Sequence, residues 1–137
     1  VVDIDDFKSI NDLYGHDVGD IALRHAAGLL RGALRLQDQI CRTGGDEFLV
    51  LCPDTGLDAA LLVAERVRLA VQKDDVDTGG PVVSLIAGIG VAERVSGMEG
   101  VEALVRVADA GARQAKQRGR NRVVAPQREL AASELPD

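Results

Sequence analysis

Apolar residues recur at helical spacing in three long segments of the chain. In residues 18–34, 57–72 and 101–117, apolar side chains return every three or four positions, as in an amphipathic α-helix with one buried face. A shorter helix is predicted over Phe7–Leu13, ended by Gly15. The chain is therefore expected to be rich in helices that cover another layer of structure.

Short apolar runs between these helices are predicted to be strands, at residues 1–4, 39–42, 48–52, 82–91 and 122–125. Gly44 and Gly45 lie between the second and third runs, and adjacent glycines allow the positive φ angles of a tight hairpin. Polar segments at 73–80 and 93–100 are predicted to be loops. This order predicts an α+β fold, in which helices cover one mostly antiparallel sheet.

Composition adds limits to this picture. The 137 residues fit one domain, which we assign to residues 1–125, and residues 126–137 are a polar, Ala-rich segment that we expect to be a flexible, disordered tail. The chain has no Trp, one Tyr and two Phe, so the core must consist of Val, Leu, Ile and Ala. A formal charge of −6 argues against a nucleic-acid-binding protein, although it does not exclude a nucleotide substrate.

Cysteine content and hydropathy suggest where the protein works. Cys41 and Cys52 lack the spacing of a zinc site, and a reducing cytoplasmic compartment is the expected location. No segment approaches the roughly 20 apolar residues that cross a bilayer, so we expect no membrane contact by this domain. Val1–Ile4 begins as a strand without a preceding cap or turn. We therefore expect a piece of a longer parent protein, which other regions can anchor to a membrane.

Acidic residues follow the first predicted strand and occupy the predicted hairpin. Asp3, Asp5 and Asp6 lie at the end of the strand, and Asp46 and Glu47 lie at the hairpin tip. If the hairpin lies beside the first strand, Asp3 and Asp46 meet at one end of the sheet. Hard cations such as Mg²⁺ prefer carboxylate and carbonyl oxygens, and paired metals support phosphoryl transfer. A surface hairpin with a solvated acidic tip explains the same spacing.

Cationic and amide side chains form two further groups. The cations are Lys8, Arg42, Lys116 and Arg120, with Arg113, Arg118 and Arg122 beside the last two. They suit a phosphate partner, but cations near a helix C-terminus also fit a solvated face. The second group is Asn11, His16 and Asp20, which can read a guanine edge or serve as turn and cap residues. No Ser/His/Asp or Cys/His nucleophile is apparent.

Three motifs, taken in order, are similar to the signatures of one known family. They are DIDDFKSINDLYGHDVGD over residues 3–20, RTGGDEF over 42–48 and AKQRGRN over 115–121. With these motifs the chain resembles the GGDEF family of diguanylate cyclases from Val1 to about Val124. Three ordered motifs at the right separations are not expected by chance.

The resemblance implies a palm-like fold and a role for each matching residue. A divalent cation, Mg²⁺ or Mn²⁺, would be held by Asp3, the Ile4 carbonyl, Asp46 and Glu47. Three residues would take part in catalysis: Asp46 as acceptor of the 3′-hydroxyl proton, Glu47 as its neighbour, and Lys8 against developing charge. Substrate GTP would be bound through its guanine by Asn11 and Asp20 with His16 nearby, and through its phosphates by Arg42, Lys116 and Arg120.

The resemblance also implies partners. Two chains would face each other as a homodimer, each with one GTP, and join them into cyclic di-GMP with release of two pyrophosphates. The family carries an Arg-x-x-Asp product-inhibition site before its hairpin, and Arg35 and Asp38 match that pattern and spacing. As a bare pattern, Arg35 and Asp38 equally describe an i,i+3 ion pair at a helix end.

The chain departs from the family pattern in three places. The helices that normally precede the first strand, with an Asp-x-Leu-Thr-Gly-Leu-like motif, are absent, so we expect an N-terminally truncated domain. Gly111-Ala112-Arg113 replaces Ala-Leu-Tyr, and Ile86 replaces a Ser. Three hypotheses remain: an active cyclase, a module that binds cyclic di-GMP or GTP with little turnover, and a regulatory domain without nucleotide. The intact set Asp3, Asp46, Glu47 and Lys8 favours the first.

Overall fold

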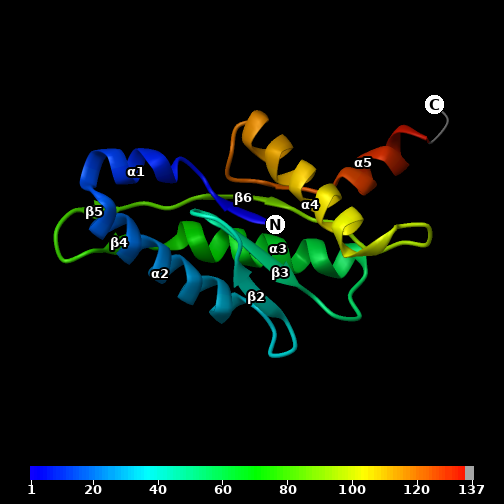
Figure 1. Cartoon of the computed structure of the whole chain (residues 1–137), viewed down its shortest axis with the longest axis horizontal. Helices are drawn as coiled ribbons and strands as arrows, with labels where there is room; N and C mark the ends of the chain where they lie inside the picture. Colours follow the sequence, from blue (N-terminus) through cyan, green and yellow to red (C-terminus); the bar gives the residue numbers. More distant parts are fainter. Residues whose placement is uncertain (135–137) are drawn as a thin grey trace.

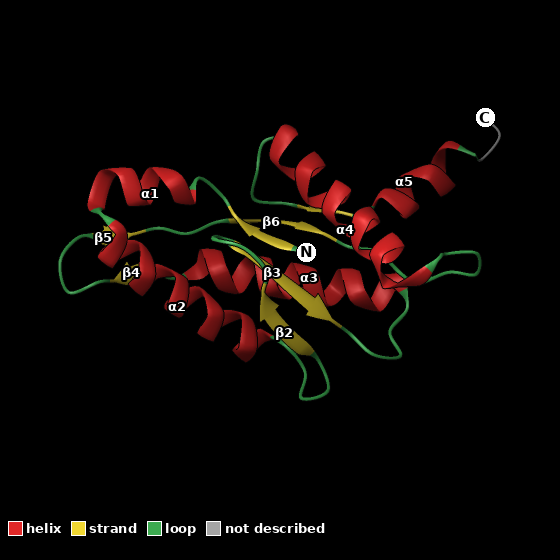
Figure 2. Cartoon of the chain, in the orientation of Figure 1, coloured by secondary structure: helices red, strands yellow, loops and turns green. Residues whose placement is uncertain are grey.

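A computed structural model describes residues 1–134 of the chain. Its strands are β1 (Val2–Ile4), β2 (Gln39–Arg42), β3 (Glu47–Leu51), β4 (Val76–Asp77), β5 (Val82–Val83), β6 (Ala87–Gly90) and β7 (Val123–Val124). Its helices are α1 (Phe7–Tyr14), α2 (His16–Ala33), α3 (Leu57–Lys73), α4 (Gly100–Gln117) and α5 (Pro126–Ser133) (Figure 1, Figure 2). The arrangement confirms the predicted α+β class.

The main sheet has the strand order β2-β3-β1-β6-β7. All neighbouring pairs are antiparallel except β6 and β7, which are parallel because α4 connects them. In the register, Asp3 of β1 lies opposite Glu47 of β3 on one side and Gly88 of β6 on the other. The first strand is therefore central, and its acidic end is enclosed by both neighbours.

The two faces of the sheet carry different helices. Val2 and Phe48 belong to the main core with residues of α2 and α3, whereas Val1 packs with Ala108 and Ala112 of α4. Because side chains alternate along a strand, Asp3 shares the face of Val1 and lies on the α4 side. The alternation thus separates an apolar face from a face that holds the carboxylates.

Helix α4 lies unusually close to this sheet. A β-carbon at Gly90 would come within 1.7 Å of the Ala108 carbonyl oxygen, and one at Gly111 within 2.7 Å of the Val124 carbonyl oxygen. Only glycine at both positions lets the backbones of α4 and its flanking strands approach this far. This approach sets the position of the C-terminal turn of α4, which carries Lys116.

The predicted strand over residues 82–91 is wrong as a single element. It divides into β5, which pairs with β4, and β6, which pairs with β1. The expected loop at 73–80 accordingly contains β4. A continuous apolar run does not show that its pairing partner changes midway, which is why the sequence pattern concealed the break.

The expectation of a disordered tail does not hold over residues 126–133, which form α5. Pro126 occupies the start of the helix, where its missing N–H costs nothing. The Gln127 side chain exchanges two hydrogen bonds of 2.8 Å with the backbone of Glu93, and Glu129 pairs with Arg118. These contacts with residues distant in the sequence hold α5, and the composition of residues 126–137 gives no sign of them. Residues 135–137 lie outside the described part of the chain.

Among residues 1–134, no helix is long and apolar enough to cross a membrane.

Candidate active site

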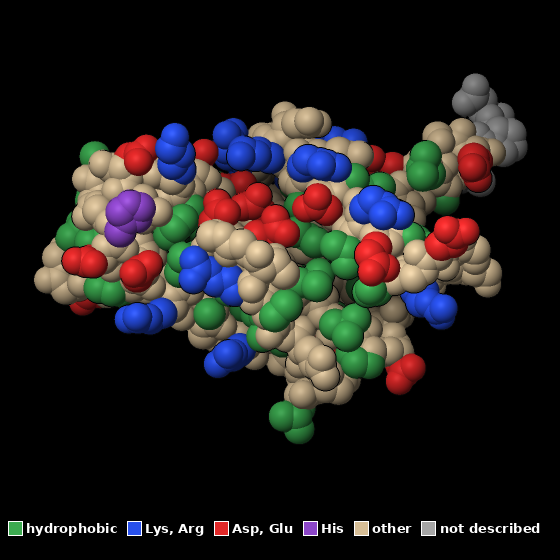
Figure 3. Space-filling view, viewed as in Figure 1, with side chains coloured by type: hydrophobic (Ala, Val, Ile, Leu, Met, Phe, Trp, Pro, Cys, Tyr) green, Lys and Arg blue, Asp and Glu red, His purple; other side chains and the backbone are tan. Residues whose placement is uncertain are grey.

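The first acidic residues and the hairpin meet at one end of the sheet, as predicted. Asp3 lies directly across from Glu47, and the Ile4 N–H donates to the Asp46 carbonyl oxygen at 2.9 Å. Pairing of β1 with β3 thus brings together the four groups expected to hold a cation: Asp3, the Ile4 carbonyl, Asp46 and Glu47. Figure 3 shows the acidic side chains gathered at this place, with Lys and Arg side chains around them.

Two carboxylates of this cluster, Asp3 and Asp5, have raised pKa values. Burial, followed by the charges of Asp46 and Glu47, raises the pKa of Asp3 to about 6, while Lys116 opposes the shift. Burial also raises the pKa of Asp5, against the opposing effects of the Asn121 N–H and Arg120. A carboxylate with a raised pKa is held at a cost in its ionised form, and nearby positive charge relieves that cost. The cluster is therefore electrostatically suited to a cation.

Protein side chains alone do not complete a metal site. Within residues 1–134, no three His, Cys, Asp or Glu side chains are arranged to hold a metal ion together. A cation at Asp3 and Asp46 would need main-chain carbonyl, water or phosphate oxygens as further ligands. That incomplete, oxygen-only set is typical of Mg²⁺ sites that share the ion with a substrate.

Arg42 shapes the hairpin rather than projecting freely from it. Its Nε lies 3.1 Å from the Gly44 carbonyl oxygen and 3.0 Å from that of Gly45, and its Nη2 donates to Gly45 at 2.7 Å. Gly44 and Gly45 permit positive φ angles, but neither adopts one. The turn between the strands is longer than the two-residue type that needs them, and the Thr43 N–H donates to the Glu47 carbonyl at 3.0 Å.

A second part of the site lies between α1 and α2. The Oδ1 of Asn11 is buried and has no hydrogen-bond partner among the described residues. A β-carbon at Gly19 would lie 1.8 Å from this oxygen, so glycine is required where the two helices cross. A buried acceptor without a donor is costly unless a ligand supplies one. Asn11 therefore lies at the crossing of α1 and α2 with its amide oxygen enclosed against Gly19.

Asp20 and Arg42 line a cavity of about 320 Å³ between α2 and the β2–β3 hairpin. Leu23 and Phe48 provide apolar surface in the same cavity. The structure therefore brings Asp20 and Arg42 together, whereas His16 is exposed at the start of α2 and does not line this cavity. A larger cavity of about 540 Å³ is lined mainly by apolar residues of α3, α4 and the sheet and contains none of the predicted site residues.

Of the remaining predicted cations, Lys116 and Arg120 lie close enough to the acidic cluster to affect the pKa values of its carboxylates. Lys8 on α1 and Lys116 on the last turn of α4 are exposed. Arg120 follows α4, and its Nε lies 3.2 Å from Asp6 Oδ2 without the geometry of a hydrogen bond. Arg120 therefore reaches the loop between β1 and α1, next to the carboxylates.

Three non-glycine residues near this cluster have left-handed backbones: Asp6, Arg120 and Asn121, with φ angles of 53°, 67° and 45°. Such conformations cost about 1–3 kcal/mol each and tend to occur at functional sites. The Asn121 N–H donates to Asp5 Oδ2 at 2.9 Å and ties the two strained loops together. The sequence pattern assigns no role to Asn121. Its position after Gly-Arg at a helix end was the available signal, because Asn tolerates this conformation.

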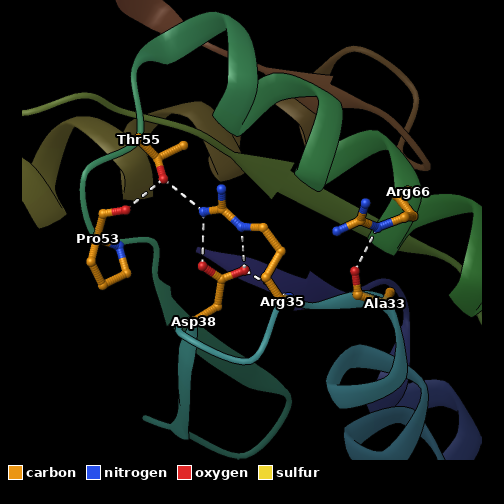
Figure 4. A network of polar contacts seen from close by, with 6 residues as sticks. All are labelled: Ala33, Arg35, Asp38, Pro53, Thr55 and Arg66. Atoms are coloured by element: carbon orange, nitrogen blue, oxygen red, sulfur yellow. Dashed lines mark hydrogen bonds and ion pairs between the residues drawn. The ribbon is translucent and has the colours of Figure 1, made fainter.

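Arg35 and Asp38 form a separate network (Figure 4), at the open end of the β2–β3 hairpin and away from its Gly44-Gly45 turn. The Arg35 Nε and Nη2 donate to the two Asp38 oxygens at 3.1 and 2.9 Å, and Nη2 also donates to Thr55 Oγ1 at 2.6 Å. The Asp38 side chain is fully buried, while that of Arg35 is 32% exposed. The arginine lowers the pKa of Asp38. Arg35 is thus the accessible member of the predicted pair.

Arg66 of α3 lies beside this network. Its Nε donates to the Ala33 carbonyl oxygen at the end of α2, at 2.6 Å (Figure 4). This contact satisfies a terminal helix carbonyl and holds α3 against the segment that leads into Arg35.

Comparison with known proteins identifies relatives over nearly the whole chain. The model of the family "Diguanylate cyclase, GGDEF domain" matches residues 1–122. Diguanylate cyclase A of Treponema denticola is 38% identical over 99% of this chain and 35% of its own length. The response regulator PleD of Caulobacter vibrioides is 44% identical over 90% of the chain and 28% of its own length. The chain thus spans about a third of these relatives.

Solved structures share the fold. The diguanylate cyclase SiaD of Pseudomonas aeruginosa, in complex with its activator SiaC, has a TM-score of 0.85 and 41% identity, covering 90% of this chain and 47% of that one. The GGDEF domain of DgcB from Caulobacter crescentus, in complex with cyclic di-GMP, has a TM-score of 0.85 and 29% identity, covering 92% and 75%. The sequence and structure comparisons therefore match the chain to the same family of domains.

Proposed function

Because the chain belongs to the GGDEF domain family of diguanylate cyclases, we propose that it condenses two GTP molecules into cyclic di-GMP and two pyrophosphates. One observation carries the proposal: Asp3, Asp46 and Glu47 converge at the end of β1 and β3, with Lys116 close enough to affect the pKa of Asp3. Carboxylates that repel one another beside cations are suited to triphosphate chemistry.

The residues present fit a magnesium ion, with Mn²⁺ as an alternative. Asp3, the Ile4 carbonyl, Asp46 and Glu47 offer only hard oxygen ligands, and their mutual repulsion favours a cation. When bound, the ion would neutralise negative charge on the phosphate oxygens. The chain's own residues would do the rest. Asp46 would accept the proton of the 3′-hydroxyl, and Lys8, Lys116 and Arg120 would stabilise charge on the phosphates.

The base would lie against α1 and α2. Asn11 would turn its amide away from Gly19 to accept from a guanine N–H, and Asp20 at the cavity of about 320 Å³ would accept a second hydrogen bond. His16 would contact solvent-exposed parts of the nucleotide. Arg42 would act mainly through the hairpin it holds, because its guanidinium donates to Gly44 and Gly45.

Catalysis would require a homodimer. Each chain would hold one GTP, and the 3′-hydroxyl of one would attack the α-phosphate of the other. The rate per chain should therefore rise with protein concentration at low concentration and then level off. A rate per chain that stays constant on dilution would contradict the dimer.

Product would bind at Arg35 and Asp38. The complex of the DgcB GGDEF domain with cyclic di-GMP supports binding of this nucleotide by the fold. The ordered Arg35–Asp38 pair also favours the second candidate, a module that binds cyclic di-GMP with little turnover. The two candidates differ in turnover alone.

The decisive experiment is incubation of the protein with GTP and Mg²⁺, with the products separated by chromatography. We expect cyclic di-GMP from the wild type, none above background from Asp46→Asn, and normal amounts from Asp74→Asn, an exposed carboxylate at the end of α3. Product formation by Asp46→Asn would contradict the assigned chemistry. Binding of cyclic di-GMP without any product would establish the second candidate.

A further inference from the structure

The loop between α4 and β7 contains a left-handed pair of residues, of which Asn121 tolerates the conformation and Arg120 does not favour it. Arg120 and Asn121 are consecutive left-handed non-glycine residues, with φ angles of 67° and 45°. Strained backbone of this kind persists only where neighbouring groups fix it. The Arg120 side chain does not fix it, since its Nε lies near Asp6 without a hydrogen-bond acceptor.

Local contacts fix part of the loop, since the Arg120 N–H donates to the Ala115 carbonyl oxygen at 2.9 Å and Arg122 Nε donates to the Arg120 carbonyl oxygen at 3.0 Å. The Asn121 side chain is held by α3. Asn121 Oδ1 accepts from Arg68 Nη1 at 3.0 Å, and Asn121 Nδ2 donates to Gln72 Oε1 at 3.1 Å. Arg68 Nη1 also donates to Gln72 Oε1 at 3.0 Å, which closes a triangle of three side chains. Both atoms of the Asn121 amide are thereby bound to residues 49 and 53 positions away.

Arg68 is itself firmly placed. Its Nε donates to Glu65 Oε2 at 2.9 Å, and its Nη2 pairs with the other Glu65 oxygen. Its side chain is only 16% exposed. An arginine bound on both edges by a carboxylate and two amides has little rotational freedom and is a rigid support for Asn121.

On its other side, Asn121 reaches the acidic cluster. Its N–H donates to buried Asp5 Oδ2 at 2.9 Å, and the preceding residue, Arg120, lies 3.2 Å from Asp6. A continuous path of hydrogen bonds thus runs from α3 through Asn121 to the loop after β1.

We infer that Arg68 and Gln72 are positioning residues for the nucleotide, because they hold Asn121 in the left-handed conformation that presents Arg120 to the triphosphate. The inference rests on the proposed binding of phosphates by Arg120. Neither residue contacts the nucleotide. Their effect is on where Arg120 points before GTP arrives.

The sharpest test replaces Asn121 by glycine. Asn121→Gly keeps the positive φ angle and the N–H bond to Asp5 but removes both contacts to α3. The matched control is Asp54→Gly, another left-handed non-glycine residue, at φ 50°, whose side chain is exposed. The ligand is 3′-deoxy-GTP with Mg²⁺, which lacks the attacking hydroxyl and so binds without reacting, and affinity is measured by calorimetry.

We expect Asn121→Gly and Arg68→Met each to weaken binding roughly tenfold, an effect typical of a lost positioning contact to a charged group. Asp54→Gly should bind like the wild type. Gln72→Glu keeps the acceptor oxygen and should remain within about twofold of the wild type, whereas Gln72→Leu should not. Wild-type affinity in Asn121→Gly, or equal weakening in Asp54→Gly, would overturn the inference.

A double-mutant cycle separates positioning from general destabilisation. Arg120→Met removes the cation itself, so adding Asn121→Gly to it should cause no further loss. Additive losses would show that Asn121 acts by another route.

Amide hydrogen exchange tests the restraint without any ligand. Exchange at residues 118–122 should accelerate in Arg68→Met and Asn121→Gly while exchange in the core of α3 stays unchanged. Unchanged exchange in the loop would overturn the inference even if binding weakens. If the wild type binds no 3′-deoxy-GTP but the loop responds as stated, the proposed function fails and the restraint stands.

Discussion

Two carboxylates near opposite ends of the β2–β3 hairpin have opposite surroundings. Asp3 is partly buried beside Asp46 and Glu47, which raises its pKa to about 6. Asp38 is fully buried and accepts from the backbone N–H, Nε and Nη2 of Arg35, which lowers its pKa. The surroundings of Asp3 disfavour its ionised form, whereas hydrogen bonds from Arg35 stabilise the ionised form of Asp38.

The difference separates two ways of building a binding site. Around Asp3 the chain concentrates unfavourable features, namely like charges and strained loops. A bound cation would relieve the repulsion between the charges. Around Arg35 the contacts are complete before any ligand binds, so that region stabilises the fold by itself. The first region gives up stability for function, as active sites commonly do.

Asp3→Asn should produce the largest effect, with cyclase activity and thermal stability changing in opposite directions. We expect cyclase activity to fall by at least about a hundredfold, because a group that supports phosphoryl transfer is lost. The same change removes a repelled charge, so the thermal midpoint should rise by about 2–3 °C at neutral pH. Parallel rate measurements and thermal melts check this. A lower midpoint would show that the repulsion is absent in solution.

The same substitution in the other region should act in the opposite direction. Asp38→Asn removes the charge that binds Arg35, and we expect the thermal midpoint to fall by roughly 5 °C at neutral pH. Because the pKa of Asp38 is lowered in the folded state, its contribution is present above the unfolded value of about 3.9 and lost as pH falls through the folded one. Melts of wild type and variant should therefore converge in acid. A constant difference at all pH values would contradict the pairing.

Magnesium affinity should depend on pH through Asp3. With a pKa of about 6, Asp3 is almost fully ionised at pH 7.5 and mostly protonated at pH 5, and a protonated carboxyl does not bind the cation. We expect affinity for Mg²⁺ to fall roughly tenfold over this range, measured by calorimetry. Asp3→Asn should bind weakly with much less dependence on pH. An equal pH dependence in that variant would assign the titration to another group.

The smallest expected effect concerns the cysteines. Burial and the charge of Asp38 raise the pKa of the Cys52 thiol, whereas Cys41 is exposed on β2. A thiol reagent should therefore modify Cys41 several-fold faster than Cys52, because the thiolate is the reactive form. Asp38→Asn should narrow the difference. Equal rates in the wild type would show that burial and the charge of Asp38 do not suppress the Cys52 thiolate.

The sequence predicts the elements in which a pattern of apolar or acidic residues recurs over a short stretch of the chain. Periodicity located the long helices to within a few residues. The positions of Asp3 and Asp46 indicated the end of the sheet where their strands meet. It could not predict α5, which depends on Gln127 contacting Glu93, or the division of residues 82–91 between two partners. It also missed Arg68, since a helix surface arginine gives no sign that it contacts Asn121. Pairings between distant residues decide all three.

The close contact between α4 and the sheet has a consequence for how the protein tolerates mutation. Gly90 touches no predicted ligand group, yet any larger residue there would push against the Ala108 carbonyl and lift α4, which carries Lys116. A genetic screen for inactive variants should therefore recover substitutions at Gly90 as readily as changes to the acidic residues. Loss of function would in that case begin as a change in the spacing of two backbones.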